Sequence, residues 1–141
     1  MAKRILVPLD HSDRTIVPVV AALARGAGAT VRLLRVLPVP EMKVGPYGRV
    51  ISYVDQEMES LRGSARVDLE SAEAELAGVP VDSVVRFGNV SAEIALEADA
   101  FSADLIALTE SRHGTLRHVV RPTTADRLTG RVEPPVLVLR E

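Results

Sequence analysis

LIALTESRHG at residues 105–114, followed by PTT at residues 122–124, is the stretch of sequence that decides the fold. Its apolar first half predicts a strand that is buried on both faces of a parallel sheet. Basic residues follow, and Thr123 and Thr124 supply hydroxyls suited to the start of a helix. A strand, a loop and a helix start in this order can direct backbone N–H groups at a phosphate. The loop, however, contains a single glycine, Gly114, where a phosphate-binding loop usually needs several.

Outside this stretch, apolar runs of strand length alternate with helical patterns along the whole chain. The predicted strands are Ile5–Leu9, Val31–Leu37, Val81–Phe87, Asp104–Leu108 and Val136–Leu139. The predicted helices begin near Thr15 with Pro18 in the first turn, at Val54, at Asn89 or Ser91, and at Thr123, where Asp126 completes a capping box. Glycines and a proline in residues 41–48 predict a mobile loop between the second strand and the second helix.

This alternation predicts an α/β fold. The expected architecture is an open, doubly wound sheet of five parallel strands with helices on both faces, similar to a Rossmann fold. The 141 residues are expected to form one domain, residues 1–141. Ligands of such sheets bind beyond the carboxyl ends of the strands, where the strand order reverses. The sequence therefore predicts that Asp10, Val36, Thr109 and the turn at Thr123 lie along one edge of the sheet.

The composition argues against several classes of protein. The formal net charge is −2, aromatic residues make up 3% and tryptophan is absent, so neither nucleic acid nor an anionic membrane is an expected partner. The chain contains no cysteine, which excludes disulfides, thiolate metal sites and a cysteine nucleophile. The apolar run at residues 5–7 is too short for a signal peptide or a membrane span. These features predict a soluble cytoplasmic protein.

The five strand segments, taken in order, resemble those of the universal stress protein family over nearly the whole chain. Residues 5–12, ILVPLDHS, are similar to the family's opening of hydrophobic residues followed by Asp-Gly-Ser, with His11 in place of the glycine. The other segments that carry the resemblance are LLRV at residues 33–36, VRFG at 85–88, ADLIAL at 103–108 and PVLVLR at 135–140. The ordered set is more specific than any single apolar strand.

The resemblance implies a fold like that of the adenine nucleotide alpha-hydrolases, a role in the stress response, and ATP or another adenine nucleotide as a possible cofactor. The cofactor-binding residues that it implies are Pro8, Leu9, Asp10, Val36, Thr109, Arg112, Thr123 and Thr124. It also implies a homodimer through the last strand, Val136–Leu139. An apolar strand at the edge of a sheet independently favours pairing with a second chain.

In the nucleotide-binding members of this family, the loop reads Gly, two residues, Gly, nine residues, Gly, and then Ser or Thr. The corresponding residues here are Thr109, Arg112, Pro122 and Thr123, so only the hydroxyl is kept. Thr109 and Arg112 add bulk, and Pro122 has no N–H to donate. Each N–H lost toward a charged oxygen costs roughly 1.5–3 kcal/mol, or one to two decades of affinity. The phosphate-binding loop is therefore predicted to be impaired.

Two interpretations of the loop stay open. Its potentially cationic side chains are Arg112, His113, Arg117, His118 and Arg121. Such side chains can grip a phosphate in place of the lost donors, or they can form an ordinary solvated basic loop. Asp10 likewise either faces an adenosine or caps the turn after its strand. Val36 either offers its backbone to an adenine ring or belongs to the core alone.

Two functions follow from these observations. The first is a stress-response binding module that forms a homodimer, binds nucleotide weakly or not at all, and is not an enzyme. The alternative is an ATP-binding member of the family that hydrolyses ATP slowly. A response-regulator receiver is excluded, because Arg86-Phe87-Gly88 stands where its third strand needs a phosphoacceptor aspartate. No P-loop, dinucleotide fingerprint or activated-serine motif occurs, and the five-residue spacing of His113 and His118 does not suit helical metal ligands.

Overall fold

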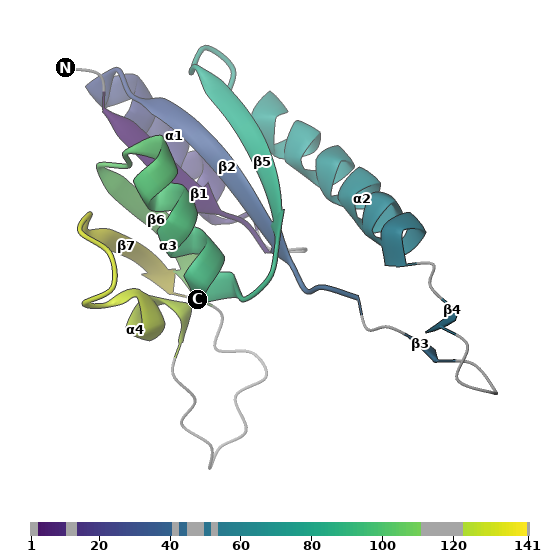
Figure 1. Cartoon of the computed structure of the whole chain (residues 1–141). Helices are drawn as coiled ribbons and strands as arrows, with labels where there is room; N and C mark the ends of the chain where they lie inside the picture. Colours follow the sequence, from purple (N-terminus) through teal and green to yellow (C-terminus); the bar gives the residue numbers. More distant parts are fainter. Residues whose placement is uncertain are drawn as a thin grey trace.

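The structure of the protein, a computed structural model, describes residues 3–10, 14–40, 43–44, 50–51, 54–110 and 123–140. Strands and helices alternate along the chain (Figure 1). The strands are β1 (Arg4–Pro8), β2 (Thr30–Leu37), β3 (Lys43–Val44), β4 (Val50–Ile51), β5 (Val81–Phe87), β6 (Leu105–Glu110) and β7 (Val136–Arg140). The helices are α1 (Ile16–Ala27), α2 (Val54–Ala74), α3 (Val90–Phe101) and α4 (Thr124–Leu128).

The main sheet is parallel and has five strands in the order β5-β2-β1-β6-β7. From β1 the chain moves outward through β2 to β5, and it then crosses back to β6 and β7 on the other side of β1. The strand order therefore reverses between β1 and β6, and β5 and β7 form the two edges of the sheet. This arrangement confirms the predicted open, doubly wound α/β fold.

A second, smaller sheet differs from the prediction. The sequence predicts only a mobile loop between β2 and α2, but β3 and β4 pair there as antiparallel strands, with Lys43 opposite Ile51 and Val44 opposite Val50. Strands of two residues are too short to produce a detectable alternation of polar and apolar residues. The rest of the predicted loop, residues 41–42 and 45–48, lies outside the described residues.

Each face of the main sheet has its own apolar cluster and its own pair of helices. Helices α1 and α2 cover one face, and α3 and α4 cover the other (Figure 1). Successive strand residues point to opposite faces, so Val7 packs in the cluster under α1 and Leu6 in the cluster under α3. Helix α2 has an apolar stripe that is buried at Leu69 and continues past the helix to Leu76. That stripe therefore packs in the core and is not a free partner-binding face.

The helices begin where the sequence predicts. Thr15 is the N-cap of α1, so Pro18 lies in the first turn, where the N–H that it lacks is not needed. Asn89 caps α3, and its side chain accepts a hydrogen bond from the Ala92 N–H at 3.0 Å. None of the helices in the described segments is both long enough and apolar enough to cross a membrane.

Strand β6 is longer than predicted, and this matters for the site. The sequence predicts an end at Leu108, but Thr109 and Glu110 continue the parallel pairing with Leu139 and Arg140 of β7. Backbone pairing with β7 thus carries the strand past its last apolar residue. As a result, both polar side chains stand at the carboxyl edge of the sheet.

Candidate functional site

A cavity of about 220 Å³ opens at the carboxyl edge of the main sheet, beside the reversal of strand order between β1 and β6. Residues from the ends of β1, β2 and β6 line it together with residues from the starts of α3 and α4. The lining residues are Pro8, Leu9, Asp10, Leu34, Arg35, Val36, Val90, Ile94, Leu108, Thr109 and Thr124. Ligands of open parallel sheets bind at this place in the fold.

Most of the predicted cofactor-binding residues meet at this cavity. Those that line it are Pro8, Leu9, Asp10, Val36, Thr109 and Thr124. Thr123 directly precedes α4 and is its N-cap. Arg112 lies outside the described residues, as does the rest of the stretch 111–122, so its role stays a prediction. Two larger hollows, of about 540 and 470 Å³, both adjoin Asp104 at the opposite edge of the sheet and contain none of the predicted residues.

Arg35 is a buried charge at the cavity that the sequence reasoning missed. It is 6% exposed and lines the cavity from β2. Its Nη2 donates to the carbonyl of Asp10 at 3.2 Å and lies 3.4 Å from Oδ2 of Asp68 on α2. The guanidinium therefore connects α2 to the chain that leaves β1. An arginine inside the apolar run LLRVL, residues 33–37, is the signal that could have revealed it.

Two buried polar atoms of the cavity residues have no hydrogen-bond partner among the described residues. They are Nε of Arg35 and Oγ1 of Thr109. A buried polar atom without a partner costs about 1–3 kcal/mol, so native proteins seldom leave one unless a water or ligand satisfies it. Both atoms belong to residues that line the same cavity. Within the described structure, the buried side-chain polar atoms that lack a hydrogen-bond partner thus belong to residues that line this cavity.

Side chains of the protein itself bond three N–H groups at the start of α4, those of Thr123, Ala125 and Asp126. Thr123 Oγ1 accepts from the Asp126 N–H, and Asp126 Oδ2 accepts from the Thr123 N–H, both at 3.1 Å, which confirms the predicted capping box. The hydrogen bond from the Thr123 backbone lowers the pKa of the Asp126 carboxyl, and the bond to the Thr123 side chain adds to this. The N–H of Ala125, one residue before Asp126, donates to Oε1 of Glu110 at 3.1 Å. Glu110 was not among the predicted site residues, because its place in β6 depends on the unpredicted length of that strand.

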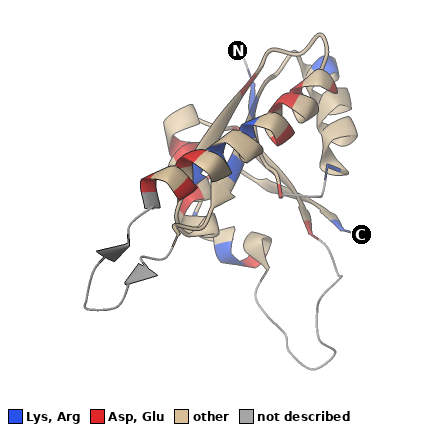
Figure 2. Ribbon diagram, turned by 90° about the vertical axis from the view of Figure 1, so that its right-hand side faces the viewer, with Lys and Arg blue, Asp and Glu red and all other residues tan. Residues whose placement is uncertain are grey.

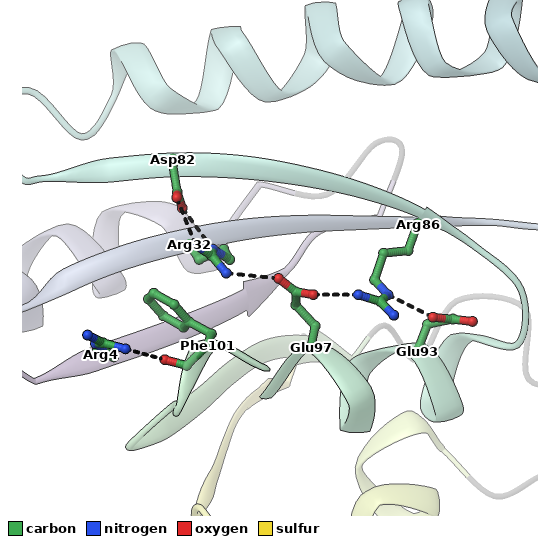
Figure 3. A network of polar contacts seen from close by, with 7 residues as sticks. All are labelled: Arg4, Arg32, Asp82, Arg86, Glu93, Glu97 and Phe101. Carbon is green, nitrogen blue, oxygen red and sulfur yellow. Dashed lines mark hydrogen bonds and ion pairs between the residues drawn. The ribbon is translucent and has the colours of Figure 1, made fainter. Parts of the chain in front are cut away.

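A closed network of ion pairs holds α3 against β2 and β5 (Figure 3). The side chain of Glu97 is 4% exposed; its Oε1 accepts from Arg32 at 3.0 Å and its Oε2 from Arg86 at 2.7 Å. Arg32 also makes two hydrogen bonds of 3.0 Å to Asp82, and Arg86 makes one of 2.7 Å to Glu93. These bonds raise the pKa of both guanidinium groups, with Asp82 the main partner for Arg32 and Glu93 for Arg86. Both arginines therefore stay charged.

The network also fixes the wall of the cavity that α3 provides. The Arg32 guanidinium lies 4.4 Å from the centroid of the Phe101 ring, and Arg4 donates to the Phe101 carbonyl at 2.9 Å (Figure 3). Val90 and Ile94, in the first half of the same helix, line the cavity. No member of the network lines it. The ion pairs thus position the helix without contributing a charge to the cavity.

Charged side chains of both signs are spread over the described helices and strands. Along the described part of the ribbon, the segments of Lys and Arg are interspersed with those of Asp and Glu (Figure 2). Among the described ranges, no group of three or more His, Asp or Glu residues is arranged to hold a metal ion. The cavity at the carboxyl edge of the main sheet is therefore the candidate site.

Comparison with protein families finds a match along the chain. The model of the universal stress protein family matches residues 1–140. No curated protein sequence matches the chain significantly.

Solved structures share the fold over nearly their whole length. The protein MJ0577 is 23% identical, with a TM-score of 0.81, and the match covers 100% of this chain and 97% of that one. A universal stress protein solved in complex with cAMP is 16% identical, with a TM-score of 0.68 and coverage of 99% and 97%. A universal stress protein from Archaeoglobus fulgidus, solved in complex with dAMP, is 18% identical, with a TM-score of 0.64 and coverage of 96% of each chain. At these identities the likeness is one of fold.

Proposed function

The chain belongs to the universal stress protein family, and from that premise we propose that it is a stress-response binding protein rather than an enzyme. We propose further that it binds adenine nucleotides weakly or not at all. The observation that supports this best is a difference between the two sides of the cavity at the carboxyl edge of the sheet. On the side formed by β1, β2 and α3, the predicted residues Pro8, Leu9, Asp10 and Val36 line the cavity. On the other side, N–H groups at the start of α4 that could bind a phosphate already bond side chains of Glu110, Asp126 and Thr123.

The size of the cavity supports this proposal. Pockets that bury drug-sized ligands measure about 300–1,000 Å³, and the cavity lined by the described residues measures about 220 Å³. The volume enclosed by the described residues can hold a base or a nucleoside. Adenine is the favoured base, because fold relatives were solved with cAMP and with dAMP.

A second candidate is an ATP-binding member that hydrolyses ATP slowly. The observation that favours it is the pair of unpartnered polar atoms at the cavity, Arg35 Nε and Thr109 Oγ1, since a polar ligand would satisfy both. Release of inorganic phosphate from ATP, measured with the purified protein, separates the two candidates. Turnover that disappears in a Thr109→Val variant would favour the second.

The decisive experiment for the proposed function is to purify the protein, denature it and look for released nucleotide, and then to titrate ATP by calorimetry. We expect no stoichiometric nucleotide and weak or absent binding. Stoichiometric ATP, or a Kd in the micromolar range or tighter, would overturn the proposal. Pro122→Gly restores a backbone donor and is expected to strengthen ATP binding by about one to two decades. Pro134→Gly, a matched change at the opposite edge of the sheet, should leave ATP binding unchanged.

We also propose that the protein is a cytoplasmic homodimer that pairs through β7. This strand is an edge of the sheet and carries the apolar sequence VLVL, with Leu137 37% exposed. Unpaired backbone groups beside apolar side chains favour pairing with a second chain. Light scattering should give the mass of a dimer for the unmodified protein and of a monomer for Leu137→Lys. Val67→Lys, on the exposed surface of α2, should stay dimeric, and a monomeric unmodified protein would refute the pairing.

A further inference from the structure

Glu110 places a negative charge next to the candidate cavity. Its carboxylate accepts from the Ala125 N–H at 3.1 Å through Oε1, and its Oε2 lies 3.7 Å from Nε of Arg140. The Glu110 side chain is only 11% exposed. Its neighbour Thr109 and the residue before Ala125, Thr124, both line the cavity. The charge therefore stands on the side of the cavity that β6 and α4 form.

Glu110 is more deeply buried than the other described charges around this side. Arg140, its partner, is largely exposed, so solvent screens the Arg140 charge more than the buried carboxylate. Asp126, in the same helix start, adds a second carboxylate. Arg35 is a cation on the β2 side of the cavity, across from Glu110; it donates to the backbone carbonyl of Asp10 and is paired with Asp68 at 3.4 Å. With Arg127 of α4 and Arg140, the described acidic and basic side chains on the α4 side are equal in number, and Glu110 is the one of these four that is mostly buried.

From this geometry we propose that Glu110 is a specificity-determining residue, which makes the cavity select adenosine-type ligands without a phosphate over the corresponding nucleotides. The inference rests on the proposed function, because it concerns the ligand of the same cavity. A phosphate near Thr109 and Thr124 would be repelled by the Glu110 carboxylate and would compete with it for the Ala125 N–H. Specificity of this kind comes from an unfavourable contact with the wrong ligand.

An uncharged ligand meets no such obstacle. The ribose hydroxyls of a nucleoside can donate or accept, and the buried Thr109 hydroxyl has no partner within the described part of the chain. A hydrogen bond between them would satisfy that hydroxyl without bringing a charge toward Glu110. The cavity, of about 220 Å³, can hold a base or a nucleoside.

The test is calorimetric titration of adenosine, AMP and ATP into the unmodified full-length protein and into Glu110→Gln. Glutamine keeps the shape and an acceptor for the Ala125 N–H but removes the charge, so the variant should fold. We expect the unmodified protein to bind adenosine more tightly than AMP by about tenfold. Glu110→Gln should tighten AMP binding by about tenfold or more and change adenosine binding by less than about twofold. Glu133→Gln, an equal change of charge at the opposite edge, should leave the ratio of the two affinities unchanged.

The outcomes separate this inference from the proposed function. An ATP Kd in the micromolar range or tighter for the unmodified protein would overturn the proposed function, and the inference with it if ATP also binds more tightly than adenosine. Weak nucleotide binding with the same adenosine-to-AMP ratio in Glu110→Gln would overturn the inference alone. If adenosine binds neither the unmodified protein nor Glu110→Gln, the inference is also overturned. The proposal that nucleotides bind weakly or not at all would stand.

Discussion

Strand β2 carries one arginine toward each face of the sheet, half-buried Arg32 and buried Arg35, and the two differ in how completely they are paired. Toward α3, Arg32 belongs to a network in which both oxygens of Glu97 are bonded and each arginine has a second acidic partner. Toward α2, Arg35 has one carboxylate at 3.4 Å and one carbonyl at 3.2 Å, and its Nε has no partner among the described residues. Only Arg35 lines the cavity.

The difference shows that arginines of one strand can have different roles: Arg32 stabilises the fold, whereas Arg35 has a donor available at the cavity. A network whose donors and acceptors are all used rigidifies the structure but has nothing left for a ligand. A buried cation with an unused donor is less favourable for folding and keeps the capacity to bind. Breaking the closed network should therefore cost more stability than removing Arg35, whereas a change at Arg35 should be felt mainly at the cavity.

The largest expected effect comes from breaking the closed network at its centre. Glu97→Ala removes the carboxylate that both arginines share and should lower the free energy of unfolding by about 3 kcal/mol, the lower end of the range for a broken buried pair, because Asp82 and Glu93 still neutralise the arginines. Urea denaturation measures this loss. Asp82→Ala, which removes a mostly exposed partner, should cost about 1 kcal/mol or less. Equal losses for the two variants would contradict the central role of Glu97.

Removing the open cluster should have a smaller effect on stability and a local effect on the cavity. Arg35→Leu removes a buried cation whose Nε has no partner among the described residues, together with its contacts to the Asp10 carbonyl and Asp68. Because the Asp68 side chain is partly exposed to water, the free energy of unfolding should change by about 1 kcal/mol or less. The Asp10 carbonyl loses its donor, and the neighbouring Leu9 amide, which bonds Leu34 at 2.8 Å, should exchange with solvent faster. Amide hydrogen exchange by NMR detects this change.

Arg25→Leu is the matched control, because Arg25 also donates to a backbone carbonyl, that of Ala77, at 3.0 Å and away from the cavity. It should leave the exchange of the Leu9 amide unchanged. Slow exchange at Leu9 in Arg35→Leu would mean that Arg35 does not hold the chain at the end of β1.

The smallest expected effect on stability comes from a third cluster, the exposed capping box at the start of α4. The pKa of Asp126 is lowered in the folded protein, so its contribution to stability is present above the ordinary carboxyl pKa of about 4 and is lost as the pH falls through the lowered folded value. Asp126→Asn should therefore be less stable than the unmodified protein at pH 7, and the difference should shrink as the pH falls below about 4. Urea denaturation at several pH values follows it. A difference that stays constant with pH would mean that the charge of Asp126 is not involved.

Most of the fold could be predicted from the sequence, because parallel strands buried on both faces leave long apolar runs. The strand at Val81–Phe87 and the caps at Thr15, Asn89 and Thr123 are where the sequence predicts them. The β3–β4 pair could not be predicted, since strands this short carry no pattern.

The site was only partly predictable. Residues at strand ends share the edge of a parallel sheet, which brought Asp10, Val36 and Thr109 to one cavity. Arg35 and Glu110 were missed for a different reason. Their roles depend on which groups they meet across the fold, the Asp10 carbonyl and the Ala125 N–H, and these contacts join residues far apart in the sequence.

The two unpaired edges of the sheet also bear on how far self-association can proceed. If both edges accepted a partner, each added subunit would expose a new edge and the product would be a filament; pairing of one edge with its own copy about a two-fold axis closes the assembly at two. Strand β5 carries Asp82 and Arg86, and charged side chains on an edge strand disfavour pairing, whereas residues 136–139 of β7 are all apolar. The asymmetry of the edges therefore favours a finite assembly over a fibre.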